Sequence, residues 1–445
     1  MARFLRRVLL GVSGALAIFT ALLVVGNVAA GAPFHTGALV WATPIAAALL
    51  ALAAFKLTTR RQFLLVFLLV NTLLLELLLE AAGWLGVLPG ITDKDRCAYG
   101  RVYWTAEGRG NSIRNRFGWY APAFDLAAPH RIAVIGDSLV EAVEVHRTRN
   151  AATRLGDLLR SRPGGFAVLG LGAHGTAPAH SLEILDYATR HFTPREAIFV
   201  LSIGSDIRES SRALNGLPPD AFIYFGLDAS GRAVPDPAST TARENFMRSI
   251  ELPHSNPLVQ VPFILRTHCM LLQTARSMRD AVSLRRRLAA RPDPGIVGDI
   301  ERDDFFRNGF DPTPFAIPPS PESQRALAVM LAELRLAKET CDARGVVFRI
   351  VTVPHFPTAF YRTQTGAAWT AQVGAYDYLR PERDVAAFAA AESIPCLALG
   401  TVMSAEKMSV DDIRAFYLLD GVGHLSERGH EFVAAQIARA FYPTP

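Results

Sequence analysis

A serine follows an apolar segment at a place where its hydroxyl could act as a nucleophile. Arg131–Gly136 reads RIAVIG, and Asp137 and Ser138 come directly after it. Gly, Asp and Ser are common in turns and helix caps, so a purely local structural role is one interpretation. The other is that a buried parallel strand ends here and presents the Ser138 hydroxyl at the edge where open α/β sheets place their sites.

A histidine near the C-terminus could serve this serine as a base. In the segment LLDGVGHLSERGH, Asp420 lies four residues before His424, and a helical pattern follows. A histidine can take the proton of a serine, and a neighbouring carboxylate can hold the ring in the productive tautomer. The N-terminus of the following helix, which we expect Ser426 to cap, favours the neutral ring. These residues together indicate nucleophilic serine chemistry.

The elements that must position these residues alternate between strand and helix. The predicted strands are Arg131–Gly136, Phe166–Leu171, Ala197–Ile203, Val346–Val353 and Ile394–Leu399. The predicted helices, with apolar residues recurring about every 3.6 positions, are Ala151–Arg160, Ala177–His191, Glu322–Arg344, Pro381–Glu392 and Glu427–Phe441. This alternation predicts an α/β fold with a parallel sheet that helices cover on both faces.

One long interval interrupts the alternation. Residues 208–321 hold a predicted hairpin around AFIYFGLDASGRAVP, a basic helical run and a proline-rich stretch, and we interpret them as an insertion over one edge of the sheet or as a cap. We therefore expect a membrane anchor in residues 1–90, a linker and lead-in in 91–130, and a catalytic domain in 131–445. The lead-in segment NRFGWYAPAF either supplies an aromatic wall to the site or packs the linker onto the domain.

The N-terminal segment is apolar enough to cross a membrane. Half of all 445 residues are hydrophobic, and Val8–Phe55 contains no Asp, Glu, Lys or Arg, which leaves room for two spans of about 20 residues around a hairpin at Gly31–Gly37. A third apolar run covers Phe63–Val87. A cleaved signal peptide over Arg3–Ala32 is the alternative, but two more apolar runs follow it. We predict three N-terminal transmembrane helices.

Basic residues predict the orientation of these helices. Arginines precede the first run, Lys56, Arg60 and Arg61 lie between the second and third, and the loop between the first two has neither Lys nor Arg. The positive-inside rule then puts the N-terminus in the cytoplasm and the chain after about Gly90 outside it. We expect a multi-pass protein of a bacterial inner membrane with its catalytic domain in the periplasm. Glu76 and Glu80, one turn apart in the third run, either reach the interface or act as intramembrane carboxylates.

The order of the polar motifs resembles that of the GDSL, or SGNH, hydrolase superfamily over about residues 110–443. Gly-Asp-Ser ends the first strand, a glycine turn LGLGAHGTA follows the second, Gly-Ser-Asp follows the third, and Asp…His lies near the C-terminus. The resemblance implies a flavodoxin-like sheet and ester hydrolysis or acyl transfer. It makes Ser138 the nucleophile and an oxyanion donor through its backbone N–H, and His424 the base. Gly175 matches the second oxyanion donor, with Gly172 as the alternative.

Two positions depart from the pattern of that superfamily. Its third oxyanion donor is an Asn, where this chain has Ser205, and loss of one donor typically costs about 3 kcal/mol of transition-state stabilisation. Its acid stands three residues before the histidine, whereas Asp420 stands one residue further away. Three other histidines, His174, His180 and His355, either line the cleft or have structural roles.

Other features narrow the classes of partner. The four cysteines, Cys97, Cys269, Cys341 and Cys396, show no CxxC and no histidine spacing of a zinc site, so we expect no metal and no cofactor. Disulfides and buried free thiols both remain open. The net charge is +5, and the basic run Arg276–Arg291 is either a solvated face or a contact with anionic lipid headgroups or an acidic glycan. Nucleic acid is excluded for a domain outside the cytoplasm.

The compartment limits the expected substrates. Neither ATP nor acyl-CoA is available outside the cytoplasm, so the resemblance implies a membrane-anchored serine esterase acting on O-acyl, chiefly O-acetyl, groups of cell-envelope glycans or related esters. One alternative is an O-acetyltransferase that works with a membrane acetyl donor or with a polysaccharide-export partner. Another is a catalytically weak glycan-binding assembly factor, which the changes at Ser205 and Asp420 favour.

Overall fold

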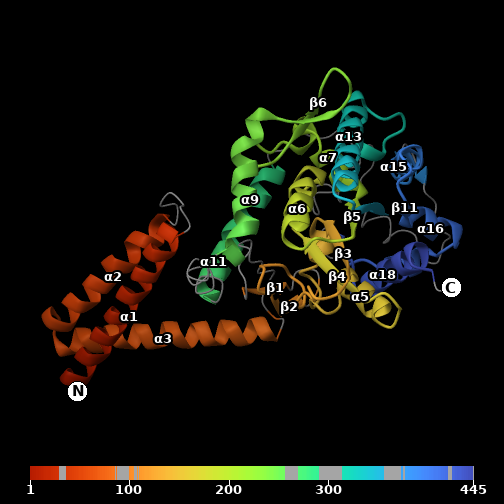
Figure 1. The fold of residues 1–445 in the computed structure, drawn as a ribbon. Coiled ribbons are helices and arrows are strands. Elements are labelled where there is room, and N and C mark those ends of the chain that lie inside the picture. Colours follow the sequence, from red (N-terminus) through yellow and green to blue (C-terminus); the bar gives the residue numbers. More distant parts are fainter. Residues whose placement is uncertain are drawn as a thin grey trace.

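Five parallel strands form the centre of the α/β part of the chain (Figure 1). The computed structural model describes residues 1–29, 37–85, 87, 100–104, 108, 110–255, 269–289, 313–354, 372–373, 376–418 and 423–443. The strands are β3 (His130–Gly136), β4 (Phe166–Gly172), β5 (Glu196–Ser202), β8 (Val347–Val353) and β11 (Cys396–Ala398). All five predicted strands are present. Their spatial order, β11-β8-β5-β3-β4, is the flavodoxin-like order 2-1-3-4-5 read from its other edge.

Helices cover both faces of this sheet, as the alternating pattern predicts. The helices are α5 (Ala151–Arg160), α6 (Pro178–His191), α13 (Pro321–Ala343), α15 (Arg380–Ala391) and α18 (Glu427–Phe441). Helices α5 and α18 pack against each other, and so do α6 and α13. Every residue of β5 is buried, because the central strands of a parallel sheet are covered on both sides.

Shorter elements surround the sheet and build the inserted segment. Further helices are α4 (Ser138–Glu141), α7 (Ile203–Glu209), α8 (Arg212–Asn215), α9 (Thr240–Ser255), α11 (Met270–Ala289), α16 (Leu399–Ala405) and α17 (Val410–Arg414). The predicted hairpin is present as antiparallel β6 (Phe225–Leu227) and β7 (Ala233–Pro235). Strands β9 (Gln372–Val373) and β10 (Tyr376–Asp377) are two residues long and pair in antiparallel orientation. Helix α9 packs along α6, and α11 contacts the N-terminal arm.

The lead-in to the sheet packs onto the domain. Strands β1 (Arg101–Trp104) and β2 (Gly110–Ile113) form an antiparallel hairpin. After it, Asn115 accepts hydrogen bonds from the backbone N–H groups of Phe117 and Trp119. The Trp119 side chain is fully buried beside the ring of Tyr187. The segment NRFGWYAPAF therefore contributes to the core at Trp119.

Three helices form an N-terminal arm: α1 (Ala2–Ala29), α2 (Gly37–Lys56) and α3 (Thr59–Trp84). In the described residues, two segments are long and apolar enough to cross a membrane, Ala2–Ala21 of α1 and the whole of α3, and Pro44–Lys56 of α2 is a shorter apolar segment. By length and composition the described residues have two candidate spans, where the sequence predicts three.

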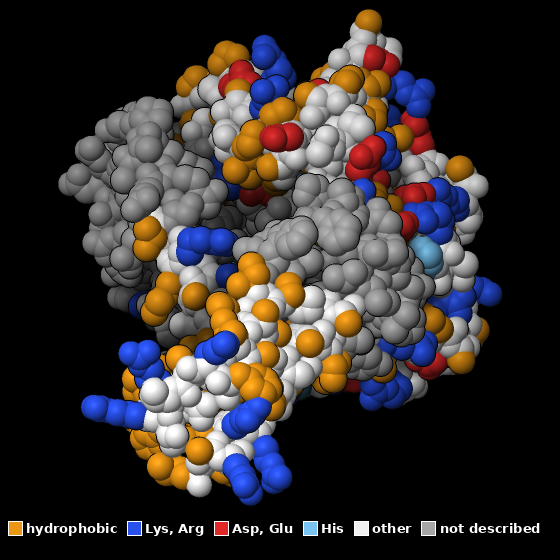
Figure 2. Space-filling view, turned by 90° about the vertical axis from the view of Figure 1, so that its left-hand side faces the viewer, with side chains coloured by type: hydrophobic (Ala, Val, Ile, Leu, Met, Phe, Trp, Pro, Cys, Tyr) orange, Lys and Arg blue, Asp and Glu red, His pale blue; other side chains and the backbone are white. Residues whose placement is uncertain are grey.

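The arm is apolar along its flanks and basic at its free end (Figure 2). Helices α1 and α2 pack together, and the Ser13 hydroxyl of α1 donates to the Ala47 carbonyl oxygen of α2 at 2.8 Å. The Arg6 guanidinium lies 3.9 Å from the centre of the Phe55 ring. This contact brings the N-terminal arginines next to the end of α2, where Lys56 and the basic start of α3 follow.

A buried carboxyl on α13 gives the stability of the domain a defined pH dependence. Glu333 is 1% exposed, accepts a hydrogen bond from the Ser210 hydroxyl at 3.1 Å, and burial raises its pKa to about 8. Between its ordinary pKa near 4.5 and about 8, the unfolded chain loses this proton while the folded chain keeps it, so stability falls as pH rises through this window.

We expect Glu333→Gln to raise the thermal unfolding temperature, by little at pH 5 and by more at pH 8, because glutamine still accepts from Ser210 and carries no ionisable proton. Thermal unfolding at both pH values measures this effect. The control is Glu339→Gln, on the exposed side of the same helix, which should show no such pH dependence. An equal shift at both pH values would contradict the burial argument.

Candidate active site

Ser138 stands at the carboxyl end of β3, where a helix begins without an intervening loop. A Cβ on Gly136 would lie 2.7 Å from both a methyl group of Val140 and the Val200 carbonyl oxygen, so glycine is needed for α4 to fold back over the strand end. The Asp137 carboxylate caps α4 by accepting from the Leu139 N–H at 2.9 Å. Asp137 thus has the capping role, and Ser138 is left partly exposed at the first position of the helix.

His424 is held by backbone contacts on both sides of it. Its carbonyl oxygen accepts from the Leu418 N–H at 2.7 Å. The Ser426 hydroxyl accepts from the Gly429 N–H at 3.1 Å and caps α18, as expected from the sequence. A Cβ on Gly429 would lie 2.1 Å from the Phe416 carbonyl oxygen, so glycine lets α18 begin against the preceding chain.

The fold brings these two residues, 286 positions apart, into hydrogen-bond contact. His424 Nε2 lies 2.9 Å from Ser138 Oγ. When Nδ1 carries the ring proton, Nε2 accepts the serine hydroxyl hydrogen, which is the geometry of a general base and its nucleophile. His424 is 9% exposed, and the edge of the Trp104 ring packs against it with centroids 6.1 Å apart. Asp420 lies outside the described residues.

The two glycines of the turn after β4 differ in their surroundings. A Cβ on Gly172 would lie 1.9 Å from the Glu141 backbone nitrogen, so Gly172 is needed for the close approach of α4 to β4. Gly175 has a φ of +66°, is exposed, and would place a Cβ in open space. Among the described residues, none would lie within 4 Å of such a Cβ, and the backbone of Gly175 is in a conformation that favours glycine.

A buried ion pair joins this turn to the helix of Ser138. The Glu141 carboxylate accepts from the His174 backbone N–H at 2.8 Å and lies 2.5 Å from His174 Nδ1. Its other oxygen lies 2.9 Å from an Arg114 nitrogen, and both side chains of the pair are almost fully buried. Glu141 and Arg114 thereby fix the position of Gly175 relative to Ser138. The sequence analysis missed both, because their contacts link segments that are distant in the chain.

Ser205 occupies the first turn of a helix. Helix α7 begins directly after β5, and the Ser205 hydroxyl lies 3.3 Å from the Ser202 carbonyl oxygen, to which it donates. The Asp206 carboxylate accepts from the Ser202 N–H at 2.8 Å. The hydroxyl of residue 205 thus donates to the backbone carbonyl oxygen that precedes its helix, and donation to an oxyanion would give up this hydrogen bond.

Buried carboxyl groups lie close to the Ser138–His424 pair. Burial raises the pKa of Asp137 to about 7, the Leu139 N–H lowers it, Glu209 raises it, and His424 lowers it. Burial also raises the pKa of Asp206 well above its ordinary range, and the charges of Asp137 and Glu209 act in the same direction. The charge on Asp137 therefore changes near neutral pH, next to the histidine.

The other histidines named from the sequence have different surroundings. His180 is buried between the rings of Phe222 and Phe246, at 4.5 and 4.9 Å, and burial lowers its pKa to about 3. A neutral histidine packed between aromatic rings has a structural role. His174 pairs with Glu141, as described above, and His355 lies outside the described residues.

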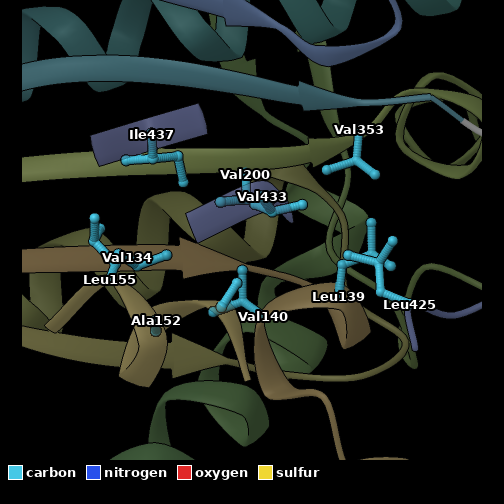
Figure 3. Close-up of a pocket in the computed structure, with 11 residues that line it drawn as sticks. Val134, Leu139, Val140, Ala152, Leu155, Val200, Val353, Leu425, Val433 and Ile437 are labelled. Carbon is cyan, nitrogen blue, oxygen red and sulfur yellow. The ribbon is translucent and has the colours of Figure 1, made fainter. Parts of the chain in front are cut away.

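A small apolar cavity of about 10 Å³ lies beneath the pair (Figure 3). Its lining includes Leu139, which follows Ser138, and Leu425, which follows His424. Figure 3 shows these two leucines near each other at the strand ends. The cavity is too small to hold a substrate, and its apolar lining supports the segments of both residues from one side.

The described residues contain no cluster of three His, Cys, Asp or Glu side chains that could hold a metal ion. Cys269, Cys341 and Cys396 carry free thiols, and burial raises the pKa values of all three. Cys97 lies outside the described residues. The site as described consists of protein side chains and backbone groups.

Comparison with known proteins shows a distant likeness to a solved structure. The sequence matches no family model and no curated protein. The chain is similar to a solved structure described as "Crystal Structure of TesA", with 10% sequence identity and a TM-score of 0.32, over 71% of this chain and 99% of the other.

The Glu141–Arg114 pair gives a test of what holds the site together. We expect Glu141→Gln to lower the free energy of unfolding by about 3–5 kcal/mol, because it leaves the Arg114 charge buried without its counterion. Urea unfolding measures the change. The matched control is Glu406→Gln, which removes the charge from the exposed pair with Arg439 and should cost less than about 1 kcal/mol. Equal costs for both variants would show that the buried pair holds nothing in place.

Proposed function

We propose that this protein is a membrane-anchored serine ester hydrolase of the SGNH type. The observation that carries the proposal is the 2.9 Å contact between His424 Nε2 and Ser138 Oγ at the carboxyl edge of the parallel sheet. Strand β3 is followed by β4 on one side and has β5 on the other, so Ser138 lies at the point where the strand order reverses. Open α/β sheets bind their ligands at such a switch point.

The proposed reaction has two steps. In the first, Ser138 Oγ attacks the ester carbonyl carbon while His424 Nε2 takes the hydroxyl proton, and the backbone N–H groups of Ser138 and Gly175 stabilise the oxyanion. The intermediate collapses to an acyl-serine, and His424 gives the proton to the departing alcohol. In the second step water, activated by His424, releases the acid and restores the serine. Asp420 is proposed to orient the His424 ring.

The arm supports a location at the outer face of a bacterial inner membrane. Helices α1 and α3 are apolar enough to span, and the proposed topology takes α2, which packs along α1 and returns to the same end of the arm, as the crossing between them. The basic residues gather at this free end of the arm, away from the α/β domain. The positive-inside rule puts that end in the cytoplasm and the domain, residues 131–445, in the periplasm. The proposed substrates are therefore O-acyl, chiefly O-acetyl, groups of cell-envelope glycans.

A second candidate function is favoured by Ser205. Its hydroxyl donates within its own helix, which leaves the oxyanion with the backbone donors of Ser138 and Gly175. A site with a weakened oxyanion hole fits a glycan-binding factor with slow turnover, or an acyltransferase whose acceptor and membrane acetyl donor are supplied by a partner. Acetate release by the purified chain alone distinguishes hydrolysis from these alternatives.

The nucleophile is tested with the full chain purified in detergent. We expect labelling by a fluorophosphonate probe and acetate release from a small acetyl ester, and we expect Ser138→Ala to abolish labelling and lower kcat at least about a thousandfold. Ser230→Ala, an exposed serine in the β6–β7 turn, is the control and should change neither. Labelling that persists without Ser138 would overturn the assignment.

The Asp137 carboxyl gives the reaction a second, pH-dependent signature. An ionised Asp137 stabilises the His424 imidazolium that forms in the transition state, and its raised pKa of about 7 means that this charge is present above neutral pH and absent well below it. We expect Asp137→Asn, which can still cap α4, to lower kcat more at pH 8.5 than at pH 5.5. Steady-state rates across this range measure the ratio of wild type to variant, and a constant ratio would contradict the argument.

A further inference from the structure

Part-buried polar contacts join the C-terminal end of α3 to the rest of the chain. The Glu80 carboxylate accepts from the Tyr103 hydroxyl at 2.5 Å and from an Arg101 guanidinium nitrogen at 3.0 Å. Both partners belong to β1, and Tyr103 is 1% exposed. A carboxylate one turn from the end of an apolar helix thus has two partners in the domain.

A second contact joins α3 to the inserted segment. The Glu76 carboxylate, one turn before Glu80, accepts from the backbone N–H groups of Met270 and Leu271, the latter at 2.9 Å. These are the first residues of α11, so a side chain of α3 caps a helix of the domain. Glu76 and Glu80 therefore have defined partners in the rest of the chain, which neither of the two sequence-based interpretations of these carboxylates included.

Apolar packing closes the space between these two contacts. Leu79 packs against Tyr103 and Met270, and Met270 is fully buried. A Cβ on Gly83 would lie 2.9 Å from the Tyr103 ring and 3.2 Å from the end of Met270, so a glycine on α3 admits both side chains. The Arg101 guanidinium also lies 4.5 Å from the centre of the Trp84 ring. We define these contacts, between residues 76–84 of α3 and β1 with the start of α11, as the α3 joint.

The α3 joint leads directly to the catalytic pair. Trp104, the residue after Tyr103, packs its ring against His424. On the other side of the hairpin, a Cβ on Gly110 would lie 1.7 Å from the Val143 carbonyl oxygen, in the segment that follows the helix of Ser138. The β1–β2 hairpin therefore contacts α3 through Arg101 and Tyr103 and contacts the segments of both catalytic residues through Trp104 and Gly110.

The length of α3 sets the level of the joint relative to a membrane. At 1.5 Å per residue, Arg60 and Glu80 are about 30 Å apart along the helix, the thickness of a hydrocarbon core. With the basic start of α3 at the inner interface, Glu80 reaches the outer one. The exposed side chains of Trp84 and Leu272 then lie at headgroup level, where aromatic and apolar residues are favourable. The domain is seated on the bilayer surface.

We propose that the site hydrolyses an ester borne by a lipid in the outer leaflet of the same membrane, namely an O-acetyl group on a lipid-linked saccharide. This inference rests on the proposed function. The bond between the acetyl carbonyl carbon and the sugar oxygen breaks, the acetyl group passes to Ser138 Oγ, and the serine proton passes through His424 to the sugar hydroxyl. Water then releases acetate.

The probe is an O-acetylated N-acetylglucosamine on a dialkyl glycerol ether, whose only ester is the acetyl group. The full chain is reconstituted in phosphatidylcholine vesicles, with the probe in the same vesicles or in separate ones, or with a soluble acetylated sugar. We expect acetate release from the probe in the same vesicles to exceed release from separate vesicles by at least about tenfold, because confinement raises the effective concentration. Release of fatty acid in place of acetate would reassign the substrate to the phospholipid and overturn the proposal.

The joint itself is tested by the double variant Glu76→Ala with Arg101→Ala. The domain then remains attached to α3 but is no longer held in one orientation relative to it. We expect acetate release from the probe in the same vesicles to fall about fivefold, while release from the soluble sugar stays within about twofold of wild type. The matched control is Arg232→Ala with Glu339→Ala, which removes an exposed ion pair and should change neither rate. An unchanged same-vesicle rate in the joint variant would overturn the proposal.

The vesicle experiments distinguish failure of the lipid-borne substrate from failure of the proposed esterase activity. Hydrolysis of the soluble sugar that depends on Ser138, with equal rates on the probe in the same and in separate vesicles, overturns the lipid-borne substrate and leaves the esterase standing. Hydrolysis of neither probe under any arrangement overturns both.

Discussion

The architecture of the site depends on how closely the short helix α4 approaches the ends of two strands. There is no space for a side chain at Gly136, where a Cβ would meet Val140 and the Val200 carbonyl, or at Gly172, where it would meet the backbone of Glu141. Because both positions are glycine, the chain turns from strand to helix within a single residue. The serine at that turn therefore lies at the carboxyl edge of the sheet. Gly429 lets α18 begin close to the backbone of Phe416, and the segment before α18 places His424 next to the serine.

Electrostatics adds a second layer to this backbone constraint. Buried carboxyl groups are costly unless they are paired or protonated, and both solutions occur around the site. One carboxylate oxygen of Glu141 pairs with Arg114, and the other accepts a hydrogen bond from the His174 N–H in the turn that carries Gly175. Desolvation is the largest influence on Asp137 and raises its pKa to about 7. One carboxyl group is thus fixed as an anion and organises the structure, while the other responds to pH next to the base.

Local patterns in the sequence were enough to predict the sheet, its covering helices and the Ser426 cap, because each strand is a short buried apolar run and each helix has its own periodicity. They also singled out Ser138 and His424, since strand ends and helix starts can be located along the chain. The sequence could not predict which residues contact Glu141, Glu80 and His424. Their contacts with Arg114, Tyr103 and Trp104 join segments that are distant in the chain, and no local pattern indicates them. The sequence predicts a strand that extends to Ile203, whereas β5 ends at Ser202 and α7 begins at Ile203, so Ser205 lies inside a helix.

The contacts between α3 and the domain limit how far from the membrane the catalytic serine can act. A helix that ends in a buried joint cannot swing, so with α3 in a bilayer the catalytic serine stands at one height above the lipid surface. Diffusion is then a search in two dimensions, and the distance from the bilayer to the ester becomes a selection criterion of its own. Two substrates with identical chemistry at the acetyl group differ for such an enzyme if one carries it a single sugar from the membrane and the other many sugars away. The length of α3 would thus select substrates by the distance of their ester from the membrane.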